Sequence, residues 1–272
     1  MLRAMAKQGF ADKIIWITGA GSGLGRALAV EFARQGADVA VSGRREARLL
    51  ETVAAVQAEG RRGLAVPCDV TDDAAVGAAV AAVIREFGRL DVAVANAGFG
   101  VMGRIENLPI EAWHRQFATN VYGTVSTCRH ALPALRMTGG RLALVASVSA
   151  MVATPNTGAY CASKYALRGI GQTLSLELHG TGVSCTLLHP GFVASEIARV
   201  DNDGHFDAGR RDPRPTQLMW SSEAAAKVMA RAISKRKREY VFTGHGKFAG
   251  FLGRHAPGLL HLVMSRFAGK GR

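Results

Sequence analysis

The sequence has few cysteines, no long apolar run and no low-complexity stretch, and each absence excludes a class of protein. The four cysteines are scattered without the paired spacing of a zinc site or a disulfide framework, so we predict four small buried hydrophobes: Cys68, Cys128, Cys161 and Cys185. The eight histidines form no H-x-x-H or H-E-x-x-H pattern, and we predict no metal. No apolar run approaches the roughly 20 residues of a membrane-spanning helix, which excludes such a helix.

The first residues also lack the marks of a secretory signal. Residues 1–8 contain neither an apolar stretch nor a small-residue cleavage site before the first predicted strand, so we expect a cytoplasmic protein. Hydrophobic residues make up 48% of the 272 residues, which is enough for a large core. Because no linker-like segment divides the chain, we expect one globular domain.

Segments rich in β-forming residues alternate along the chain with segments of helical periodicity. The predicted strands cover residues 13–18, 38–42, 63–67, 91–95, 141–146, 183–189 and 239–243. The predicted helices cover residues 23–35, 46–59, 72–87, 109–130, 159–179 and 222–236. This alternation predicts an α/β fold with a doubly wound, seven-stranded parallel sheet flanked by helices. Ligands of such sheets bind beyond the carboxyl ends of the strands.

A glycine-rich turn joins the first predicted strand to the first helix. It reads Thr-Gly-x-x-x-Gly-x-Gly at Thr18, Gly19, Gly23 and Gly25, which departs from the general G-x-G-x-x-G dinucleotide pattern. Glycine lets the backbone approach a pyrophosphate, whose charge then meets the amides at the start of the helix. Close packing of the helix on the strand would also account for these glycines, so the turn alone leaves both interpretations open.

Tyr160 and Lys164 lie four residues apart in a predicted helix and therefore project from one face. An unperturbed phenol has a pKa near ~10, and a neighbouring cation stabilises the phenolate, which lowers that pKa toward working pH. The spacing therefore suits a proton-transfer pair. The structural alternative is a tyrosine and a lysine that share a solvated helix face by accident.

These two features occur together with three others. Asn96-Ala97-Gly98 follows the fourth predicted strand, Ser147 precedes Tyr160 by thirteen residues, and Pro190-Gly191 follows the sixth strand. From about residue 13 to residue 244 the chain resembles the short-chain dehydrogenase/reductase family in the order and separation of these motifs. The resemblance implies a single-domain Rossmann-type fold and an oxidoreductase that acts on CH–OH donors or on the corresponding carbonyls with a nicotinamide cofactor.

The resemblance also assigns catalytic roles. The implied set is Asn120, Ser147, Tyr160 and Lys164. Tyr160 would be the general acid/base and Ser147 a second donor to the substrate oxygen. Lys164 would lower the pKa of the phenol and bind the nicotinamide ribose, and Asn120 would hold a proton-relay water. For Asn120 a helix kink or a subunit contact is the structural alternative.

A second implied set would bind the cofactor. It comprises Gly19, Ser22, Gly23, Leu24, Gly25, Arg44, Arg45, Asp69, Val70, Asn96, Ala97, Gly98, Tyr160, Lys164, Pro190, Gly191, Val193 and Ser195. Within it, Asp69 and Val70 would bind the adenine and Asn96 the adjoining ribose. The loop from Pro190 to Ser195 would anchor the carboxamide, with Ser195 where threonine is usual in the family.

The end of the second predicted strand indicates which nicotinamide cofactor binds. An acidic residue there would hold the ribose 2′-hydroxyl and repel a 2′-phosphate, whereas arginine offers forked donors to that phosphate. The sequence has Gly43, Arg44 and Arg45 and no carboxylate, which predicts NADP(H). Two arginines that merely begin a solvated helix are the alternative.

The substrate is less clearly indicated. Apolar residues follow several of the motifs and are candidates for the wall of the site: Phe99, Val101, Met102, Met151, Val152, Ala153, Phe192 and Ile197. They favour a hydrophobic aldehyde, ketone or secondary alcohol, although such stretches are equally often ordinary core. Residues 193–218, which include Asp201-Asn202-Asp203-Gly204, are predicted to form a polar lid over the pocket.

Positive charge is concentrated at the carboxyl end of the chain. The net charge is +13, and residues 227–272 hold eleven Lys/Arg against one acidic residue, which leaves only +3 for residues 1–226. We therefore separate a dinucleotide-binding and catalytic domain, residues 1–245, from a basic extension, residues 246–272. In the extension Leu259, Leu260, Val263, Met264 and Phe267 recur at helical spacing.

Three interpretations of this extension remain open. The helix could dock on its own domain or on a neighbouring subunit, since exposed apolar stripes are usually covered. It could instead lie as an interfacial helix on anionic lipid, which would give peripheral membrane contact. Nucleic-acid binding is the weakest of the three because no recognised motif accompanies the charge, and we predict no nucleic-acid partner.

Two classes of function are consistent with the sequence. The first is an NADP(H)-dependent carbonyl reductase or alcohol dehydrogenase, with a 3-oxoacyl-carrier-protein-type reductase as the alternative enzyme. The second is an NADP-binding sensor or scaffold without chemistry, which the presence of all four catalytic residues disfavours. Likeness to the family also implies a homodimer or homotetramer formed through the helices at 109–130 and 159–179.

Overall fold

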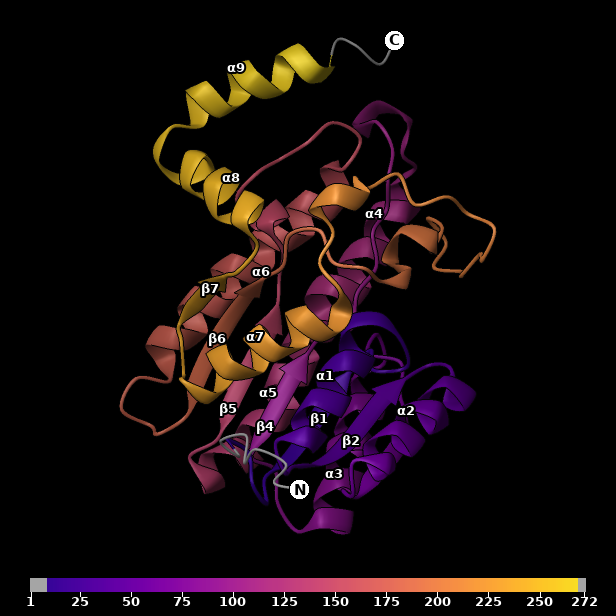
Figure 1. Ribbon diagram of the computed structural model, residues 1–272, viewed down its shortest axis with the longest axis vertical. Helices are drawn as coiled ribbons and strands as arrows, with labels where there is room; N and C mark the ends of the chain where they lie inside the picture. Colours follow the sequence, from indigo (N-terminus) through magenta and orange to yellow (C-terminus); the bar gives the residue numbers. More distant parts are fainter. Residues whose placement is uncertain (1–8, 269–272) are drawn as a thin grey trace, which may run out of the picture.

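The computed structural model describes residues 9–268 as an α/β protein whose seven strands form one parallel sheet (Figure 1). The strands are β1 (Ile14–Thr18), β2 (Asp38–Gly43), β3 (Gly63–Pro67), β4 (Val92–Ala95), β5 (Arg141–Val145), β6 (Ser184–His189) and β7 (Glu239–Val241). Their order across the sheet is β3-β2-β1-β4-β5-β6-β7. The connection after β3 therefore crosses to the other side of β1, and β1 and β4 meet at the switch point where such sheets bind ligands.

Helices cover both faces of this sheet. The helices are α1 (Gly23–Arg34), α2 (Glu46–Ala58), α3 (Asp73–Phe87), α4 (Ile110–Phe117), α5 (Gly123–Thr138), α6 (Gly158–Glu177), α7 (Ser222–Ser234), α8 (Gly244–His255) and α9 (Pro257–Ala268). One apolar cluster joins the sheet to α1, α2 and α7, and a second joins it to α3, α5 and α6. The fold is thus the doubly wound, Rossmann-type arrangement that the alternation predicts.

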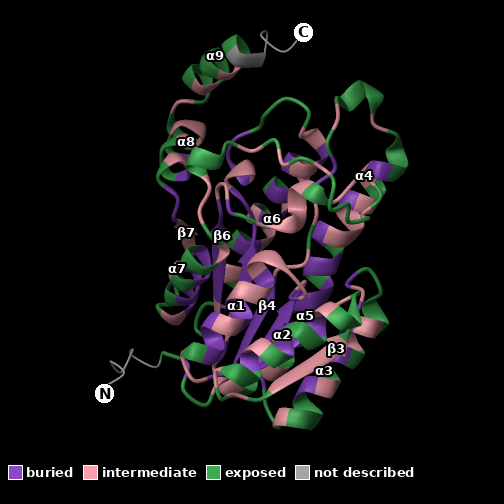
Figure 2. Cartoon of the chain, turned by 45° about the vertical axis from the view of Figure 1, so that its right-hand side comes forward, coloured by how far each residue is buried: buried purple, intermediate pink, exposed green. Residues whose placement is uncertain are grey.

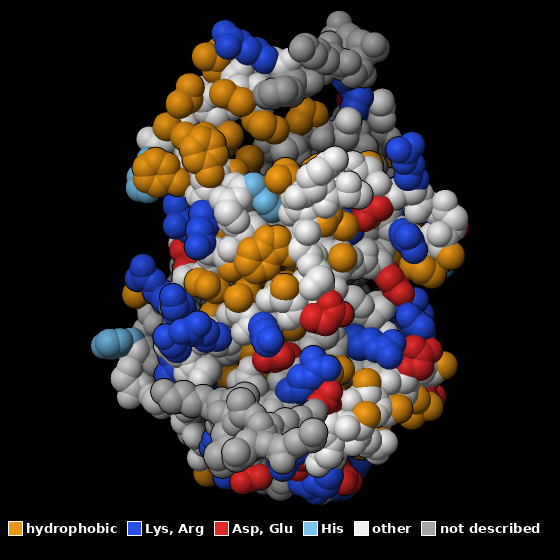
Figure 3. Space-filling model, viewed as in Figure 1, with side chains coloured by type: hydrophobic (Ala, Val, Ile, Leu, Met, Phe, Trp, Pro, Cys, Tyr) orange, Lys and Arg blue, Asp and Glu red, His pale blue; other side chains and the backbone are white. Residues whose placement is uncertain are grey.

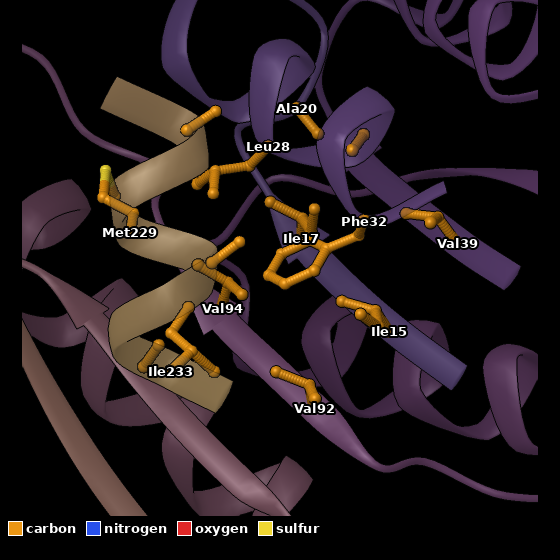
Figure 4. Packing of buried hydrophobic residues seen from close by; sticks show 14 of the residues in the cluster. Ile15, Ile17, Ala20, Leu28, Phe32, Val39, Val92, Val94, Met229 and Ile233 are labelled. Carbon is orange, nitrogen blue, oxygen red and sulfur yellow. The ribbon is translucent and has the colours of Figure 1, made fainter. Parts of the chain in front are cut away.

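Alternate side chains of the strands pack into one or the other of the two clusters. Ile15 and Ile17 of β1 pack under α1 and α7 with Phe32 and Ile233, as Figure 4 shows, whereas Trp16 points to the opposite face. Because successive side chains of a strand alternate in direction, a strand covered on both faces must be apolar throughout, and all five residues of β1 are buried. Figure 2 shows the same burial along the central strands.

The predicted elements differ from the observed ones mainly in the fourth helical segment. A single helix over 109–130 was expected, but α4 ends at Phe117, a π-helical segment covers Ala118–Tyr122, and α5 then continues to Thr138. A π-helical turn contains about one residue more than an α-helical turn. The spacing of apolar residues is not precise enough to detect this difference, so the sequence could not reveal the interruption. The last strand ends at Val241 rather than at the predicted residue 243, and Thr243 instead caps the start of α8.

The chain after β7 forms two helices that extend beyond the sheet. In Figure 1, α8 lies beside the loops at the carboxyl ends of the strands, and α9 lies at the top, away from the sheet. The sequence predicted helical spacing over α9 but not α8, so the extension predicted from residue 246 begins inside the first turn of a helix. The side chain of Phe267 lies outside the described residues. Within the described part of the chain, no helix is long and apolar enough to cross a membrane.

Candidate active site

A cleft of about 550 Å³ lies at the carboxyl ends of the strands, at the switch point of the sheet. All eighteen residues of the predicted cofactor-binding set line it, and so does Ser147. They come from the turns after β1, β2, β3, β4, β5 and β6 and from α6. The parallel sheet brings these turns to one edge, which is why motifs far apart in sequence meet in one cleft.

The glycines of the turn after β1 divide into two kinds. Gly19 and Gly23 have positive φ values of 65° and 51°, which favour glycine. At Gly25 a Cβ would lie 2.4 Å from the carbonyl oxygen of Gly19, so this glycine permits close packing of α1 on β1. Both interpretations of the turn, cofactor approach and helix packing, therefore apply to different glycines of one motif.

The start of α1 is open toward the cleft. The side chain of Ser22, the N-cap residue, makes no capping hydrogen bond to the helix and instead accepts one from Arg45 at 3.3 Å. Helix N-termini carry unpaired amides and the positive end of the helix dipole, so this end of α1 suits a phosphate group.

Thr18 and Asn96 hold the glycine turn against the end of β4. The hydroxyl of Thr18 accepts hydrogen bonds from the backbone amides of Asn96 at 3.1 Å and Ala97 at 3.2 Å. The amide nitrogen of Asn96 donates in return to the carbonyl oxygens of Thr18 and Gly19. Asn96, which the resemblance predicts to bind a ribose, thus holds the glycine turn in position.

Arg44 and Arg45 lie at the end of β2, but their surroundings differ. Arg45 pairs with Glu196 at 2.9 Å, and a second arginine, Arg48, contacts the same carboxylate. Burial raises the pKa of Glu196, but the hydrogen bonds from Arg45 and Ser22 and the arginine charges outweigh burial and leave that pKa lowered. In the described part of the chain Arg44 forms no ion pair and donates only to the carbonyl oxygen of Gly204 at 3.2 Å. Arg44 is therefore the better placed of the two for a phosphate.

Tyr160 and Lys164 lie one turn apart on α6, facing the cleft beside Ser147. Burial raises the pKa of Tyr160, while a hydrogen bond with Ser147 and the charge of Arg214 act in the opposite direction without overcoming it. The pair spacing had predicted a lowered pKa, and this prediction is wrong for the protein alone. The cause is that the phenol lies in a desolvated position, which penalises its phenolate form.

The Lys164 ammonium is held under the phenol ring. Its side chain is buried, Nζ donates to the carbonyl oxygen of Val145 at 3.0 Å, and Nζ lies 5.6 Å from the centroid of the Tyr160 ring. Burial lowers the pKa of Lys164 to about 8. A lysine with this environment can change its protonation near neutral pH, which an exposed lysine does not.

Asn120 lies in the π-helical segment and is fully buried. Its Oδ1 accepts from the backbone amide of Phe99, and its Nδ2 donates to the Phe99 carbonyl and to the Ser163 hydroxyl, each at 3.1 Å. The side chain thus fastens the loop after β4 to α6. Asn120 does not itself line the cleft, so its predicted contact with a relay water stays a prediction.

The loop after β6 and residues 193–218 close the other side of the cleft. Arg214 donates to the carbonyl oxygens of Val193 and Ser195 and pairs with Asp212 at 2.8 Å. Across the mouth, Asn202 exchanges two hydrogen bonds of 2.9 Å with the backbone of Met102. These polar contacts hold the segment that the sequence identified as a lid in place over the cleft.

His189, the last residue of β6, is buried and contacts Ser147, which the sequence did not predict. Its Nδ1 lies 2.9 Å from the carbonyl oxygen of Ser147, and its Nε2 lies 2.9 Å from Oε1 of Glu239. The second contact is close but is not aligned as a hydrogen bond. Contact with His189 and the charges of Arg254 and Arg168 lower the pKa of Glu239 to about 2. The only sequence signal was a polar residue between an apolar strand and Pro190.

The wall of the cleft differs from the predicted one. Of the eight apolar candidates, Phe99 and Ile197 line it, together with Val200 and Phe206. Val101, Met151 and Val152 are instead buried in the protein, and Phe192 stacks on His245 with ring centroids 5.1 Å apart. Two arginines that the sequence did not single out, Arg115 and Arg214, also face the cleft. The wall therefore combines apolar side chains with the two arginines and with Asp203.

The cysteines and the acidic residues of the described structure carry side chains that can bind metal ions. All four cysteines are buried free thiols. Within residues 9–268 no group of three or more His, Cys, Asp or Glu side chains is arranged to hold a metal ion.

Comparison with known proteins places this cleft among nucleotide-dependent oxidoreductases. Residues 13–205 match the model of the family described as short chain dehydrogenase. An uncharacterized NAD-dependent oxidoreductase of Mycobacterium tuberculosis is 39% identical over 193 residues, which are 65% of this chain and 70% of that protein. A 3beta-hydroxysteroid dehydrogenase of Mediterraneibacter gnavus is 36% identical over 182 residues, 66% of each chain. The crystal structure of a short-chain dehydrogenase/reductase from Burkholderia phymatum in complex with NAD has a TM-score of 0.81 and 29% identity, covering 94% of this chain and 97% of that one.

Proposed function

The chain belongs to the short-chain dehydrogenase family, and from that premise we propose an NADP(H)-dependent oxidoreductase that transfers hydride between nicotinamide and a carbonyl or secondary alcohol. The observation that carries this proposal is the meeting of Tyr160, Ser147 and Lys164 in one cleft with the glycine turn after β1. A sensor or scaffold would not need a buried lysine beside a half-buried phenol, because removing both groups from water costs stability.

The residues of the cleft fit a nicotinamide dinucleotide. The uncapped start of α1 suits the pyrophosphate, the turn at Asp69 and Val70 suits the adenine, and Lys164 and the loop from Pro190 to Ser195 suit the nicotinamide end. Gly191 lets this loop pack against the start of α8, because a Cβ there would lie 2.3 Å from both His245 and Thr243. The bound dinucleotide would supply the hydride donor or acceptor.

The side chains of the cleft would supply the proton transfer. In the reductive direction Tyr160 donates its proton to the oxygen of the substrate carbonyl as the carbon accepts hydride, and Ser147 donates a hydrogen bond to the same oxygen. In the oxidative direction Tyr160 accepts that proton back. Lys164 stabilises the phenolate that remains, and this electrostatic contribution grows as the charge develops on Tyr160.

The preference for NADP(H) rests on Arg44. Gly43 leaves no carboxylate at the end of β2, and the guanidinium of Arg44 is free of ion pairs in the described structure. The name of one relative and the ligand of the Burkholderia structure specify NAD, so the family itself does not decide the cofactor. We infer that Arg44 would hold the 2′-phosphate of NADP(H), because its guanidinium offers forked donors to a phosphate.

Replacing Arg44 with alanine tests this preference. We expect the KM for NADPH to rise about tenfold, because one charge-assisted hydrogen-bonded pair contributes roughly 1.5 kcal/mol, while the KM for NADH stays unchanged. Steady-state kinetics with both cofactors measures the effect. Arg34→Ala, an exposed arginine on the far end of α1, is the control. Equal changes for the two cofactors would contradict the assignment.

The substrate is proposed to be hydrophobic. Phe99, Ile197, Val200 and Phe206 present apolar surface to the cleft, and one relative is named a hydroxysteroid dehydrogenase. Arg115 of α4 already pairs with Asp203, and Arg214 with Asp212, so both cationic positions have a carboxylate partner. An uncharged carbonyl or alcohol is therefore the better match for the space.

The assembly and location are also proposals. Tyr122 and Leu176, on the segments that relatives of this family use for pairing, are exposed apolar residues, which supports a homodimer or homotetramer through these helices. A cytoplasmic location agrees with four cysteines that are all free thiols.

One assay tests the proposed activity. The near-ultraviolet absorbance of NADPH is followed against a panel of hydrophobic aldehydes, ketones and acyl thioesters, with Tyr160→Phe as the matched control. We expect NADPH consumption with at least one uncharged carbonyl and none with the variant. Equal turnover by the variant would remove the role given to the phenol, and preference for acyl thioesters would favour a 3-oxoacyl-type reductase.

A further inference from the structure

The carboxyl-terminal helices α8 and α9 present large apolar side chains outward, and we propose that they form a docking surface for anionic lipid membranes. We call the exposed side chains Phe248, Phe251, Leu259, Leu262 and Val263 the apolar face. This inference goes beyond the proposed function, because binding to lipid requires neither the cofactor nor turnover.

The inner face of α8 is made of glycine. At Gly253 a Cβ would lie 2.2 Å from the carbonyl oxygen of Met151, and at Gly246 it would lie 2.7 Å from the side chain of Val148. At Gly250 a Cβ would lie 3.2 Å from the sulfur of Met151. Residues 246, 250 and 253 are spaced as one face of a helix, so α8 lies close against the body through its smallest residues.

The outer face of the same helix carries its largest residues. The exposed fractions of Phe248 and Phe251 are 68% and 60%. A surface helix of a soluble domain ordinarily turns such residues toward the core and polar residues toward water. Here the order is reversed, which indicates that another apolar phase covers the outer face.

The next helix extends this surface. α9 packs mainly on α8, so its apolar residues are not buried by the sheet or its loops, and Leu259 is 53% exposed. Figure 3 shows hydrophobic side chains gathered over α8 and α9, beside the arginine and lysine side chains of the same end of the molecule. Two short helices with adjoining apolar surfaces are long enough to lie in a membrane interface but not to span it.

The charge of this segment selects the kind of lipid. Residues 244–272 contain Lys247, Arg254, Arg266, Lys270 and Arg272 and no acidic residue, and of these Arg254 pairs with Glu239 of β7. Each basic residue near an anionic surface contributes roughly 1 kcal/mol of attraction, which weakens with salt. A second copy of this chain is a poorer partner, since a symmetric contact would bring the same cationic segments together.

The surface also lies next to the mouth of the cleft. The backbone amide of Phe192, in the loop after β6, donates to Nε2 of His245 at the start of α8. Met151, against which α8 packs, follows Ser147 by four residues. Docking through α8 and α9 would therefore hold the cleft close to the lipid, where a hydrophobic substrate dissolves; this consequence alone rests on the proposed function.

Vesicle sedimentation tests the docking surface. The full chain is mixed with vesicles of phosphatidylcholine alone or of phosphatidylcholine with phosphatidylglycerol, at low and high salt. We expect pelleting only with the anionic vesicles and less of it at high salt. The double variant Phe251→Ser/Leu259→Ser should lose about tenfold in partition coefficient, because two apolar side chains no longer enter the interface.

The matched control is Leu50→Ser/Ile84→Ser, which removes two exposed apolar residues from α2 and α3; Leu50 is 54% exposed, close to Leu259. The control should pellet like the wild type.

The proposal is overturned if the wild type stays in solution with anionic vesicles, or if the test variant pellets as well as the wild type. It is also overturned if the test variant forms a smaller assembly than the wild type in sedimentation velocity without vesicles, since the apolar face would then be a subunit interface. NADPH turnover with a water-soluble aldehyde should be equal in all these proteins, which separates this test from the proposed activity.

Discussion

The cofactor side and the substrate side of the cleft are built in different ways. On the cofactor side, the turn after β1 is fixed by backbone contacts: Gly25 packs against Gly19, and Asn96 binds the carbonyls of the turn. On the substrate side, residues 193–218 are held by polar side chains, those of Asn202, Asp203 and Arg214. The difference teaches that close backbone packing fixes the glycine turn, whereas exposed contacts of residues 193–218, such as the pair of Arg115 and Asp203, can change at small energetic cost.

The largest effect is expected at the point where the two sides meet. Tyr160→Phe removes the proton donor and should lower kcat by about a thousandfold, while the Kd for NADPH stays within about twofold. Stopped-flow turnover and fluorescence titration of NADPH measure the two quantities. Retained kcat would show that another group supplies the proton, and a lost affinity would show that the ring positions the cofactor.

A glycine of the cofactor side should come next. Gly25→Ala places a methyl group against the Gly19 carbonyl, and overpacking of about 1–3 kcal/mol should weaken NADPH binding about ten- to a hundredfold. Calorimetric titration measures the affinity. Gly169→Ala, on an exposed position of α6 with no atom within 4 Å of the added Cβ, is the control and should bind normally. An unchanged Kd in Gly25→Ala would mean that the turn is as adaptable as the lid.

The buried Lys164 predicts a dependence of stability on pH. Its pKa is lowered to about 8 in the folded protein, below the unfolded value of about 10.5, so the unfolded state binds more protons between these pH values. The wild type should therefore gain stability relative to Lys164→Met as the pH rises from about 8 to about 10.5. Urea unfolding at several pH values measures this difference, which should reach a few kcal/mol. If the difference in unfolding free energy between the two proteins did not vary with pH, the Lys164 ammonium would be solvated in the folded protein.

The smallest effect should come from the substrate side. Asn202→Ala removes the two hydrogen bonds to Met102 across the mouth of the cleft. Because these bonds are exposed, we expect a rise of about three- to tenfold in the KM for the carbonyl substrate, with kcat nearly unchanged. Asn107→Ala, on the neighbouring exposed turn, is the control for the kinetic assay. A loss of kcat as large as that of Gly25→Ala would erase the contrast between the two sides.

Much of the fold was predictable from local pattern. β3 has the predicted bounds, Gly63–Pro67. A glycine and a proline mark the two ends of this short run of β-forming residues, so the pattern locates both ends of the strand. That the predicted residues would line one cleft was predictable, because most of them follow a strand and parallel strands end at one edge of a sheet. The family resemblance, confirmed by the match over residues 13–205, supplied their identities.

The remainder depends on tertiary contacts that no local pattern records. The raised pKa of Tyr160 follows from burial, which the spacing to Lys164 cannot reveal. The contact of His189 with the Ser147 carbonyl joins residues 42 positions apart. The glycine face of α8 had a visible signal in Gly246, Gly250 and Gly253, but only the structure shows which surface those glycines meet.

Transfer of the label from NADPH deuterated at nicotinamide carbon 4 tests the central claim most directly. With a hydrophobic ketone that the wild type reduces, mass spectrometry of the alcohol is predicted to show one deuterium on the carbinol carbon from one of the two C4-labelled stereoisomers and none from the other. An alcohol without deuterium from either stereoisomer, or one labelled from deuterated solvent at that carbon, would contradict hydride transfer in this cleft.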